Sequence, residues 1–289
     1  MTHRKEKTPF RIKIGVLIGS LLFLVPSSSS LPQDVQSSPS KVSVDLTKLK
    51  AVENQPFGPG ERFKFIIKYQ FVGAGHSTLE TKWGEMKDGR PTLQFVSNAK
   101  SNDFIDVFFK VRDFNASTVD ALTLASLHFH QNLREGHYRV VRNTTIDYSS
   151  GTFNYERRYK GRTSHHSGTV SEPVSDILAS FFYARTLPLE LGKSYSIRVF
   201  SNKNVYSLKV DVDDRLHDVK VPAGRFECLR LTPHVIGDGI FKGKEKGKMF
   251  LWLTNDDIRM PVLIRSKVFI GAFDAELMEY VHAHAEPEK

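Results

Sequence analysis

The sequence predicts an all-β protein with one or two short helices. We expect a curved antiparallel meander sheet that forms an open or half-closed barrel, with a helix on its concave side. Three observations lead to this prediction: apolar and polar residues alternate in about ten runs, turn residues separate these runs at short intervals, and one clear helical segment interrupts them. Twenty-one Phe residues indicate an aromatic interior, either a filled core or the lining of a cavity for an apolar ligand.

Residues 1–30 have the pattern of a secretory signal peptide. Five Lys and Arg residues within positions 1–13 precede an apolar run from Ile14 to Val25. This run is too short to span a bilayer of about 30 Å as a helix, and the Ser-rich segment after it offers a cleavage site. We therefore expect secretion across the inner membrane of a Gram-negative bacterium into the periplasm. The alternative is an uncleaved membrane anchor.

The remaining chain divides into three parts. Residues 31–56, rich in Ser, Pro, Gln and Lys, predict a flexible tether, residues 57–282 a single β-rich domain, and residues 283–289 a disordered tail. Signal removal lowers the formal net charge from +9 to +5, because residues 1–30 hold five cations and one anion. This charge permits peripheral contact with anionic lipid, glycan or phosphate surfaces. Without a basic cluster it does not predict nucleic-acid binding.

The strand pattern begins at Glu61. In "ERFKFIIKYQF" Phe63 and Phe65 point to one face, while Arg62 and Lys64 point to the other, as in a half-buried strand. The same alternation recurs in "RPTLQFVSNA", "LASLHFHQNL", "HYRVVRNTTIDY", "GTFNYERRY", "KSYSIRVFS", "NVYSLKVDVDD", "GRFECLRLTPHVI", "GKMFLWLT", "MPVLIRSKVF" and "FDAELMEYVHA". Turns such as "KDGRP", "YSSG" and "VPAG" separate the runs, so we expect consecutive strands to be antiparallel neighbours.

Two segments depart from this alternation. In "SNDFIDVFFKV" the apolar residues follow possible caps at Asn102 and Asp103, which predicts a short helix. In "SEPVSDILASFFYARTLP" Ser175 or Asp176 can cap a helix from Ile177 to Arg185, and Pro188 stops it. Its Phe-rich face needs an apolar partner, and the concave side of the sheet is the one available.

The pair Asp256 and Asp257 in "TNDDIRMP" lies between two apolar runs. Short polar side chains that bond to nearby backbone favour a structural turn here. A functional carboxylate is the alternative, although adjacent acids supply at most one half of a glycosidase pair.

The sequence predicts neither a metal site nor a cofactor. His128 and His130 share one strand face, but no carboxylate or Cys stands at ligand spacing, so we interpret them as an exposed polar face. Cys228 is the single cysteine and is expected to be a buried thiol. No phosphate-binding Gly loop, nucleophile elbow or zinc-protease helix is present. We therefore expect a protein that is not an enzyme.

Several segments together resemble a known family. "PFGPGERFKFIIKYQFVGAG", "LREGHYR", "SDILASFFYARTLPLELGKSY", "VKVPAGRFECLRLTP" and "MFLWLTNDDIRMPVLIRSKVFIGAFDAEL" are similar, in order and spacing, to the bacterial exported family known as domain of unknown function 3108. The resemblance covers most of residues 56–280. It implies a signal sequence and an antiparallel β domain, without an established activity.

A weaker resemblance concerns the last hairpin. Trp252, Asp257 and Pro261 stand as in the outer-membrane lipoprotein-sorting carriers, whose curved open barrel holds acyl chains against covering helices. Because the likeness spans about thirty residues, it implies analogy in fold rather than shared function.

These patterns favour a non-enzymatic periplasmic binding or chaperone-like module for a lipid, acylated or amphipathic envelope component. We expect the ligand to be lined by Phe63, Phe65, Phe181, Phe182 and Trp252, with Arg134 and Arg259 as headgroup partners. One alternative is a structural cell-envelope protein that binds anionic glycan or protein partners. A second is a glycan-acting enzyme with facing carboxylates in a groove. The sequence does not fix the oligomeric state.

Overall fold

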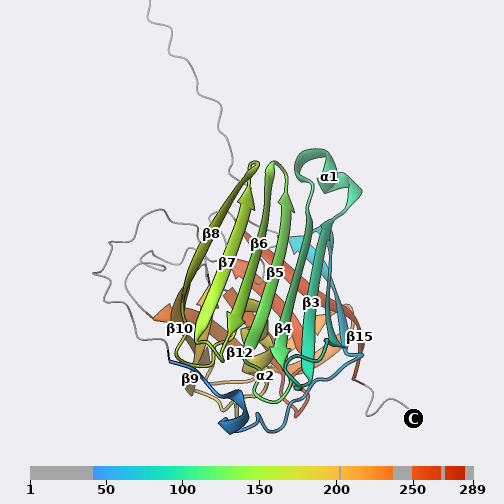
Figure 1. The fold of residues 1–289 in the computed structure, drawn as a ribbon. Coiled ribbons are helices and arrows are strands. Elements are labelled where there is room, and N and C mark those ends of the chain that lie inside the picture. Colours follow the sequence, from blue (N-terminus) through green and yellow to red (C-terminus); the bar gives the residue numbers. More distant parts are fainter. Residues whose placement is uncertain (1–41, 202, 237–248, 268–270, 284–289) are drawn as a thin grey trace, which may run out of the picture.

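The computed structural model describes residues 42–201, 203–236, 249–267 and 271–283 (Figure 1). Its described helices are η2 (Leu46–Lys48, a 3₁₀ helix), α1 (Asp103–Phe109) and α2 (Ile177–Arg185). Its described strands are β1 (Arg62–Tyr69), β2 (Val72–Trp83), β3 (Thr92–Ser101), β4 (Arg112–Asp120), β5 (Ser126–Glu135), β6 (Tyr138–Asp147), β7 (Thr152–Tyr159), β8 (Arg162–Thr169), β9 (Ser194–Ser201), β10 (Asn204–Val212), β11 (His217–Val221), β12 (Gly224–Ile236), β13 (Met249–Thr254), β14 (Pro261–Lys267) and β15 (Ala272–Val281). The predicted signal peptide and residues 284–289 of the predicted tail lie outside the described residues.

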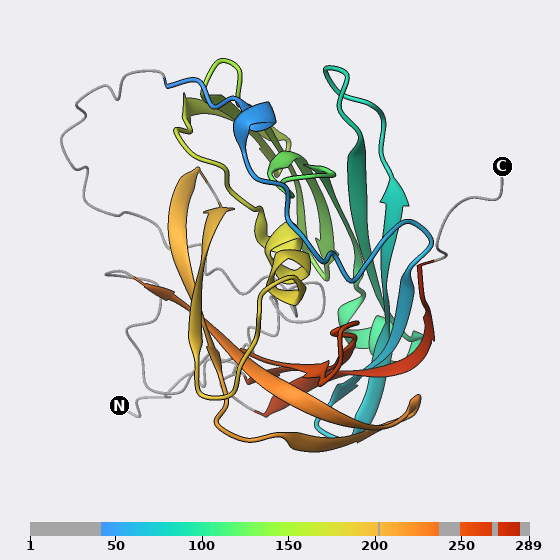
Figure 2. The same cartoon turned by 90° about the horizontal axis from the view of Figure 1, so that it is seen from below.

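One curved antiparallel sheet forms the body of the protein (Figures 1 and 2). Its order is β8-β7-β6-β5-β4-β3-β2-β1-β15-β14-β13-β12-β10-β9, and β11 pairs with β12 beside this path. Most neighbours are consecutive in the chain, but β1 pairs with the last strand, β15. Strands β8 and β9 end the path without pairing with each other. The predicted fold class, an open antiparallel barrel with two short α-helices, is therefore confirmed.

Helix α2 lies against the concave face of this sheet, as predicted (Figure 2). The Asp176 carboxylate caps its start by accepting hydrogen bonds from the N–H groups of Leu178 (2.9 Å) and Ala179 (3.0 Å). Phe182 is fully buried and stacks on Phe95 of β3, with ring centroids 3.7 Å apart. The aromatic interior at this end of the barrel is thus packed around the helix.

The helix is buried on more sides than an amphipathic pattern predicts. Ser180 and Arg185 are buried together with Leu178, Phe181 and Phe182. A helix on an open sheet keeps one face in solvent, but this sheet curves around α2. The prediction of a helix with one apolar face is therefore corrected to a helix embedded in the core.

An ion pair fixes the C-terminal end of α2. The guanidinium of Arg185 donates hydrogen bonds to both carboxylate oxygens of Glu61, at 2.7 and 2.8 Å, and both side chains are almost completely buried. It also donates to the backbone carbonyls of Ile258 and Arg259, each at 3.1 Å. Removing one partner of a buried pair leaves an uncompensated charge. This cluster therefore joins α2, the start of β1 and the β13–β14 turn.

The Asp256 carboxylate has the structural role in its turn that the sequence predicts. The Asp256 carboxylate accepts hydrogen bonds from the N–H groups of Ile258 and Arg259, both at 3.0 Å, and from the Thr254 hydroxyl at 2.7 Å. Arg259 adopts a positive φ of 50°. The turn thereby directs the Arg259 carbonyl toward Arg185.

Residues 42–56 correct the predicted tether. Val44 N–H donates to the carbonyl of Tyr148 and Val52 N–H to that of Leu122, each at 2.8 Å. The Gln55 side chain donates to the carbonyl of Ala121 at 2.9 Å. The sequence of these residues lacks periodicity because they form an irregular segment that lies along the domain. The rest of the predicted tether, residues 31–41, falls outside the described residues.

Candidate functional site

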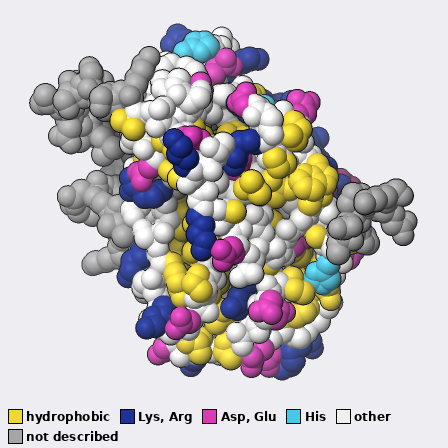
Figure 3. All heavy atoms as spheres, turned by 60° about the horizontal axis from the view of Figure 1, so that its bottom comes forward, with side chains coloured by type: hydrophobic (Ala, Val, Ile, Leu, Met, Phe, Trp, Pro, Cys, Tyr) yellow, Lys and Arg dark blue, Asp and Glu magenta, His cyan; other side chains and the backbone are white. Residues whose placement is uncertain are grey.

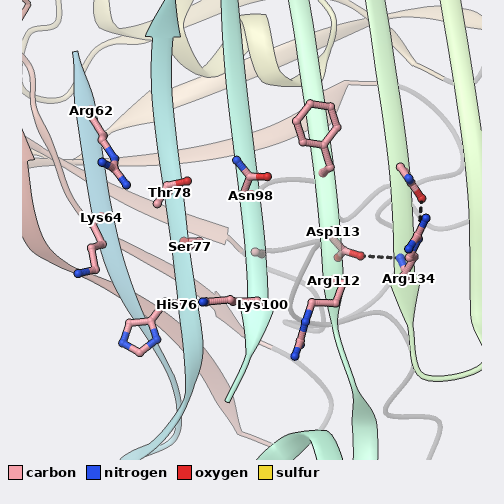
Figure 4. Close-up of a pocket in the computed structure, with 13 residues that line it drawn as sticks. Arg62, Lys64, His76, Ser77, Thr78, Asn98, Lys100, Arg112, Asp113 and Arg134 are labelled. Carbon is pink, nitrogen blue, oxygen red and sulfur yellow. Dashed lines mark hydrogen bonds between the residues drawn. The ribbon is translucent and has the colours of Figure 1, made fainter. Parts of the chain in front are cut away.

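A groove of about 710 Å³ crosses the outer face of strands β1 to β5 (Figure 4). Arg62 and Lys64 line it from β1, where they alternate with the core residues Phe63 and Phe65. The groove therefore lies on the face of the sheet opposite to α2. Its basic side chains are Arg62, Lys64, His76, Lys100, Arg112 and Arg134, and the other residues that line it are Ser77, Thr78, Asn98, Ala99, Asp113, Phe114 and Asn132. We call this feature the basic groove.

Strand register brings these residues together. Lys64 of β1 is opposite Thr78 of β2, and Thr78 is opposite Asn98 of β3. In the next row His76 is opposite Lys100 of β3. Directly opposite residues share a face of the sheet. The short side chains of Thr78 and Asn98 leave space between the longer basic side chains of the groove.

The second row continues to β4, where Lys100 is opposite Arg112. Two like charges directly opposite each other are unfavourable unless a counter-charge lies nearby. Arg112 has one, because its guanidinium contacts the Asp106 carboxylate of α1 at 2.5 Å. The Arg112 contact is the leading reason why the pKa of Asp106 is lowered.

The basic side chains differ in how far they are neutralised. Arg62 lies 3.4 Å from a carboxylate oxygen of Glu80, and Lys64 lies 2.8 Å from one of Glu279. Within the described part of the chain, no carboxylate pairs with Lys100 or Arg134. Arg134 Nε donates only to Asn132 Oδ1, at 3.3 Å. Lys100 and Arg134 are thus the cations of the groove with donors to offer to a ligand.

A buried carboxyl group lies under the groove. Asp113 accepts a hydrogen bond from the backbone N–H of Arg134 at 2.7 Å (Figure 4) and contacts the buried Glu135 side chain. Burial raises the pKa of Asp113 to about 6. The two acids touch each other and are closed off from solvent, so no sugar ring fits between them. They do not form the facing pair that glycoside hydrolysis requires.

The structure separates the predicted site residues. Phe63, Phe65, Phe181 and Phe182 lie in the core on the concave side, whereas Arg134 lines the outer groove. Arg259 lies in the β13–β14 turn. Arg134 is therefore separated from the predicted aromatic lining by the sheet. Arg259 lies closer to that lining, because its carbonyl accepts a hydrogen bond from Arg185, whose guanidinium carbon lies 5.3 Å from the ring centroid of Phe63.

Trp252 lies on the opposite side of the sheet from that aromatic core. Cross-strand pairing places Ile67, Ala275, Ile264 and Leu251 on one face, the concave one. Trp252 follows Leu251 in the chain and consequently faces outward. There its ring lies 6.4 Å from that of His217 on β11 and 5.8 Å from the Arg265 guanidinium carbon. Trp252 belongs to the same buried apolar cluster as the predicted Phe residues, but it joins that cluster from the other face of the sheet, because the run "FLWL" is covered on both faces.

Sequence reasoning missed His76, Lys100 and Arg112 as groove residues. The available signal was the alternation of charged and apolar residues, which had marked Arg62 and Lys64 as outward-facing. That signal does not say which strands are neighbours, so it could not assemble the groove. Cys228, by contrast, is a fully buried free thiol as predicted, and burial raises its pKa to about 12.

The sequence matches a known protein family, and a solved structure of low sequence identity has a similar fold. Residues 64–278 match the family described as protein of unknown function (DUF3108). A β-barrel-like protein of domain of unknown function DUF1849 from Brucella abortus is similar in structure, with a TM-score of 0.50 and 9% identity over 78% of this chain and 98% of that chain. A protein with a YmcC-like fold from Bacteroides fragilis has a TM-score of 0.28 and 12% identity over 78% of this chain and 97% of that one. No curated protein matches the sequence.

Proposed function

Since the chain belongs to the DUF3108 family, whose function is unknown, we propose a function from the geometry of its basic groove. The protein is a non-enzymatic binding or chaperone-like module for an anionic, amphipathic component of the bacterial envelope, a lipid or another acylated molecule. The observation that carries this proposal is the pair of unneutralised cations, Lys100 and Arg134, in a groove of about 710 Å³. We place this activity in the periplasm, because residues 1–30 have the pattern of a secretory signal.

The chemistry of the groove suits an anionic headgroup. A phosphate or carboxylate accepts charge-assisted hydrogen bonds from ammonium and guanidinium groups, which are stronger than neutral hydrogen bonds. Thr78, Asn98 and Asn132 supply neutral polar groups beside the cations. Phe114, which remains partly exposed, gives the groove an apolar surface as well. A ligand that combines an anion with an apolar portion satisfies both kinds of lining.

The outer groove supports binding better than the concave side does. Phe63, Phe65 and Phe182 each expose no more than 2% of their surface, and Phe182 is stacked on Phe95. Such close-packed aromatic rings form a core, and an acyl chain would have to displace them. We therefore assign these Phe residues to stability and the headgroup contact to Arg134 and Lys100.

Titration with a soluble anionic lipid tests the proposal. We expect dihexanoyl phosphatidylglycerol, kept below its micelle concentration, to bind, and dihexanoyl phosphatidylcholine to bind much more weakly. The substitutions Lys100→Gln and Arg134→Gln should each weaken phosphatidylglycerol binding about tenfold or more, because a hydrogen bond to a charged group contributes about 1.5–3 kcal/mol. Isothermal titration calorimetry measures both effects.

Lys220→Gln is the matched control. Lys220 is an exposed lysine on β11, outside the groove, so the same loss of charge there should leave the affinity unchanged. An equal loss in Lys220→Gln would show nonspecific charge attraction and refute the groove. Tight binding of an acidic oligosaccharide without lipid binding would instead favour a structural envelope protein that binds anionic glycan.

A further inference from the structure

An exposed apolar cluster lies at one end of the barrel. Three of its members, Phe71, Val107 and Phe108, are 95%, 78% and 75% exposed, more than any other large hydrophobic residue described. Phe104 and Val72 are also more than half exposed. We call these five residues the apolar tip. Water-exposed apolar residues are ordinary when they are scattered, but a cluster of this kind marks an interaction site.

The tip is built from two elements held together by one residue, Asn102. Asn102, just before α1, donates from its side chain to the Gly73 carbonyl at 2.8 Å and from its backbone to the Ala74 carbonyl at 3.0 Å. These bonds fix α1 beside the β1–β2 hairpin that carries Phe71 and Val72. Asn102 also caps α1 by accepting the Ile105 N–H at 2.9 Å. The two parts of the tip therefore share one end of the barrel, where α1 projects beyond β3 (Figure 1).

Helix α1 displays apolar residues on the side where a surface helix normally has polar ones. Ile105 and Phe109 turn toward the core and pack against it. Phe104 and Phe108 turn outward, with ring centroids 5.8 Å apart. The inward pair anchors the helix, so the outward pair is presented on a fixed support.

Basic residues adjoin the tip. Lys100 and Arg112, which line the basic groove, flank α1 in the chain, and Lys110 at its C-terminal end is exposed. The acids of α1 are Asp103 and Asp106. Asp106 contacts both Arg112, at 2.5 Å, and Lys110, at 3.9 Å. Lys100, Arg112 and Lys110 therefore outnumber the two acids of α1 by one positive charge. The basic groove thus opens beside an apolar projection.

We propose that the apolar tip inserts into the interface of an anionic lipid bilayer, so that lipid headgroups reach the adjoining end of the basic groove. Apolar side chains next to cations are the combination that binds a membrane surface, because the apolar groups enter the acyl boundary while the cations attract anionic headgroups. A projecting helix turn suits shallow insertion. None of the described helices has the length and apolar character needed to span a bilayer. The identity of the headgroup rests on the proposed function. The mode of docking rests on the apolar tip alone.

The opposite end of the barrel has exposed apolar residues of its own, which allow a direct comparison with the tip. In the view of Figure 3 acidic, basic and hydrophobic side chains are interspersed over that surface. Trp83 and Met86, at the far end of β2, are 60% and 64% exposed. They supply matched positions at which the same substitutions should have no effect on membrane binding.

Vesicle flotation tests the inference, with the exported protein and vesicles of phosphatidylcholine alone or with about one third phosphatidylglycerol. We expect binding to the anionic vesicles and a loss of at least tenfold in Phe104→Ser/Phe108→Ser, while Trp83→Ser/Met86→Ser binds as the unsubstituted protein does. In Phe71→Trp, addition of the anionic vesicles should shift the fluorescence emission to shorter wavelength relative to the unsubstituted protein. Unchanged melting temperatures verify that both double variants are folded.

The outcomes separate the tip from the groove. Undiminished flotation of Phe104→Ser/Phe108→Ser would overturn membrane docking by the tip, even if dihexanoyl phosphatidylglycerol still bound the groove. Flotation that depends on the tip, without binding of the soluble lipid, would support the docking and refute the groove as a lipid site. A dimer in solution that the same double substitution converts to a monomer, with no flotation of either protein, would assign the tip to a second copy of the chain and overturn the inference.

Discussion

Helices α1 and α2 are both short and rich in Phe, and both are capped by an Asn or Asp side chain, yet their surroundings are opposite. Phe182 of α2 is fully buried, whereas Phe108 of α1 is 75% exposed. Local composition does not account for this difference. The sheet curves around α2, while α1 lies at the end of the strands, where only one of its sides meets the barrel (Figure 1). The comparison indicates that one helix closes the core and the other is available for contact with a partner.

The largest expected effect is at α2. Phe182→Ala removes a ring that stacks on Phe95 and leaves a cavity in a close-packed core, so we expect a loss of about 3–5 kcal/mol in the free energy of unfolding. Urea denaturation followed by circular dichroism measures it. A loss well below 2 kcal/mol would show that the interior at α2 is loosely filled. It would restore the prediction that these aromatic residues line a ligand cavity.

The next effect is at the α1 end of the interior, where the inward row includes Ser77, Ala99 and Asp113. The pKa of Asp113 is about 6 in the folded protein, raised from 3.8 by burial. The folded state therefore favours the protonated acid. The contribution of protonated Asp113 to the free energy of unfolding is fully present below pH 3.8 and is lost as the pH rises through 6. About 2 kcal/mol of this stabilisation is lost between pH 4.5 and pH 7.

Asp113→Asn should remove that pH dependence, because the amide does not titrate. We expect the difference in unfolding free energy between pH 4.5 and pH 7 to change by about 2 kcal/mol relative to the unsubstituted protein, with the variant favoured at the higher pH. Chemical denaturation at the two pH values provides the measurement. An identical pH dependence in both proteins would mean that Asp113 is ionised in the fold at pH 4.5 and has a counter-charge.

The fold was more predictable from the sequence than the site was. In β1 and β13 large apolar residues alternate or run together, so these strands are evident in the sequence. Strands β2, β4, β8 and β11 were missed, and in β4 the inward positions hold Asp113, Asn115 and Ser117, which carry no apolar signal. The number of strands was underestimated for this reason. The two parts of the sheet that enclose α2 are joined by the pairing of β1 with β15, far apart in the chain.

The candidate site depends on the same long-range pairing. Alternation alone gives the outward direction of Lys64 on β1 and of Arg134 on β5. Their common groove requires the register of the three strands between them, and short side chains at Thr78 and Asn98. The tip similarly needed the contact of Asn102 with Gly73. Sequence reasoning identified the helix at Asp103 but not that Phe104, Val107 and Phe108 stay in solvent.

A smaller effect is expected at the turn that supports α2. Asp256→Ala removes the carboxylate that accepts the Ile258 and Arg259 N–H bonds, which orient the Arg259 carbonyl toward Arg185. We expect a loss of about 1 kcal/mol in stability. Asp257→Asn is the control and should change stability by less than that. Abolished ligand binding in Asp257→Asn at an unchanged melting temperature would instead identify a functional carboxylate in the turn.

The smallest expected effect on stability is at α1, and it sharpens the comparison most. Phe108→Ser replaces a side chain that is already in water, so the free energy of unfolding should change by no more than about 0.5 kcal/mol. Thermal denaturation and urea denaturation in the absence of lipid both measure this change. The same substitution at Phe109, which packs against the core, should cost clearly more, because it removes buried apolar area. If Phe108→Ser were as destabilising as Phe109→Ser, Phe108 would be part of the core in solution. The two helices would then share one structural role, and no exposed apolar tip would remain to dock on a membrane.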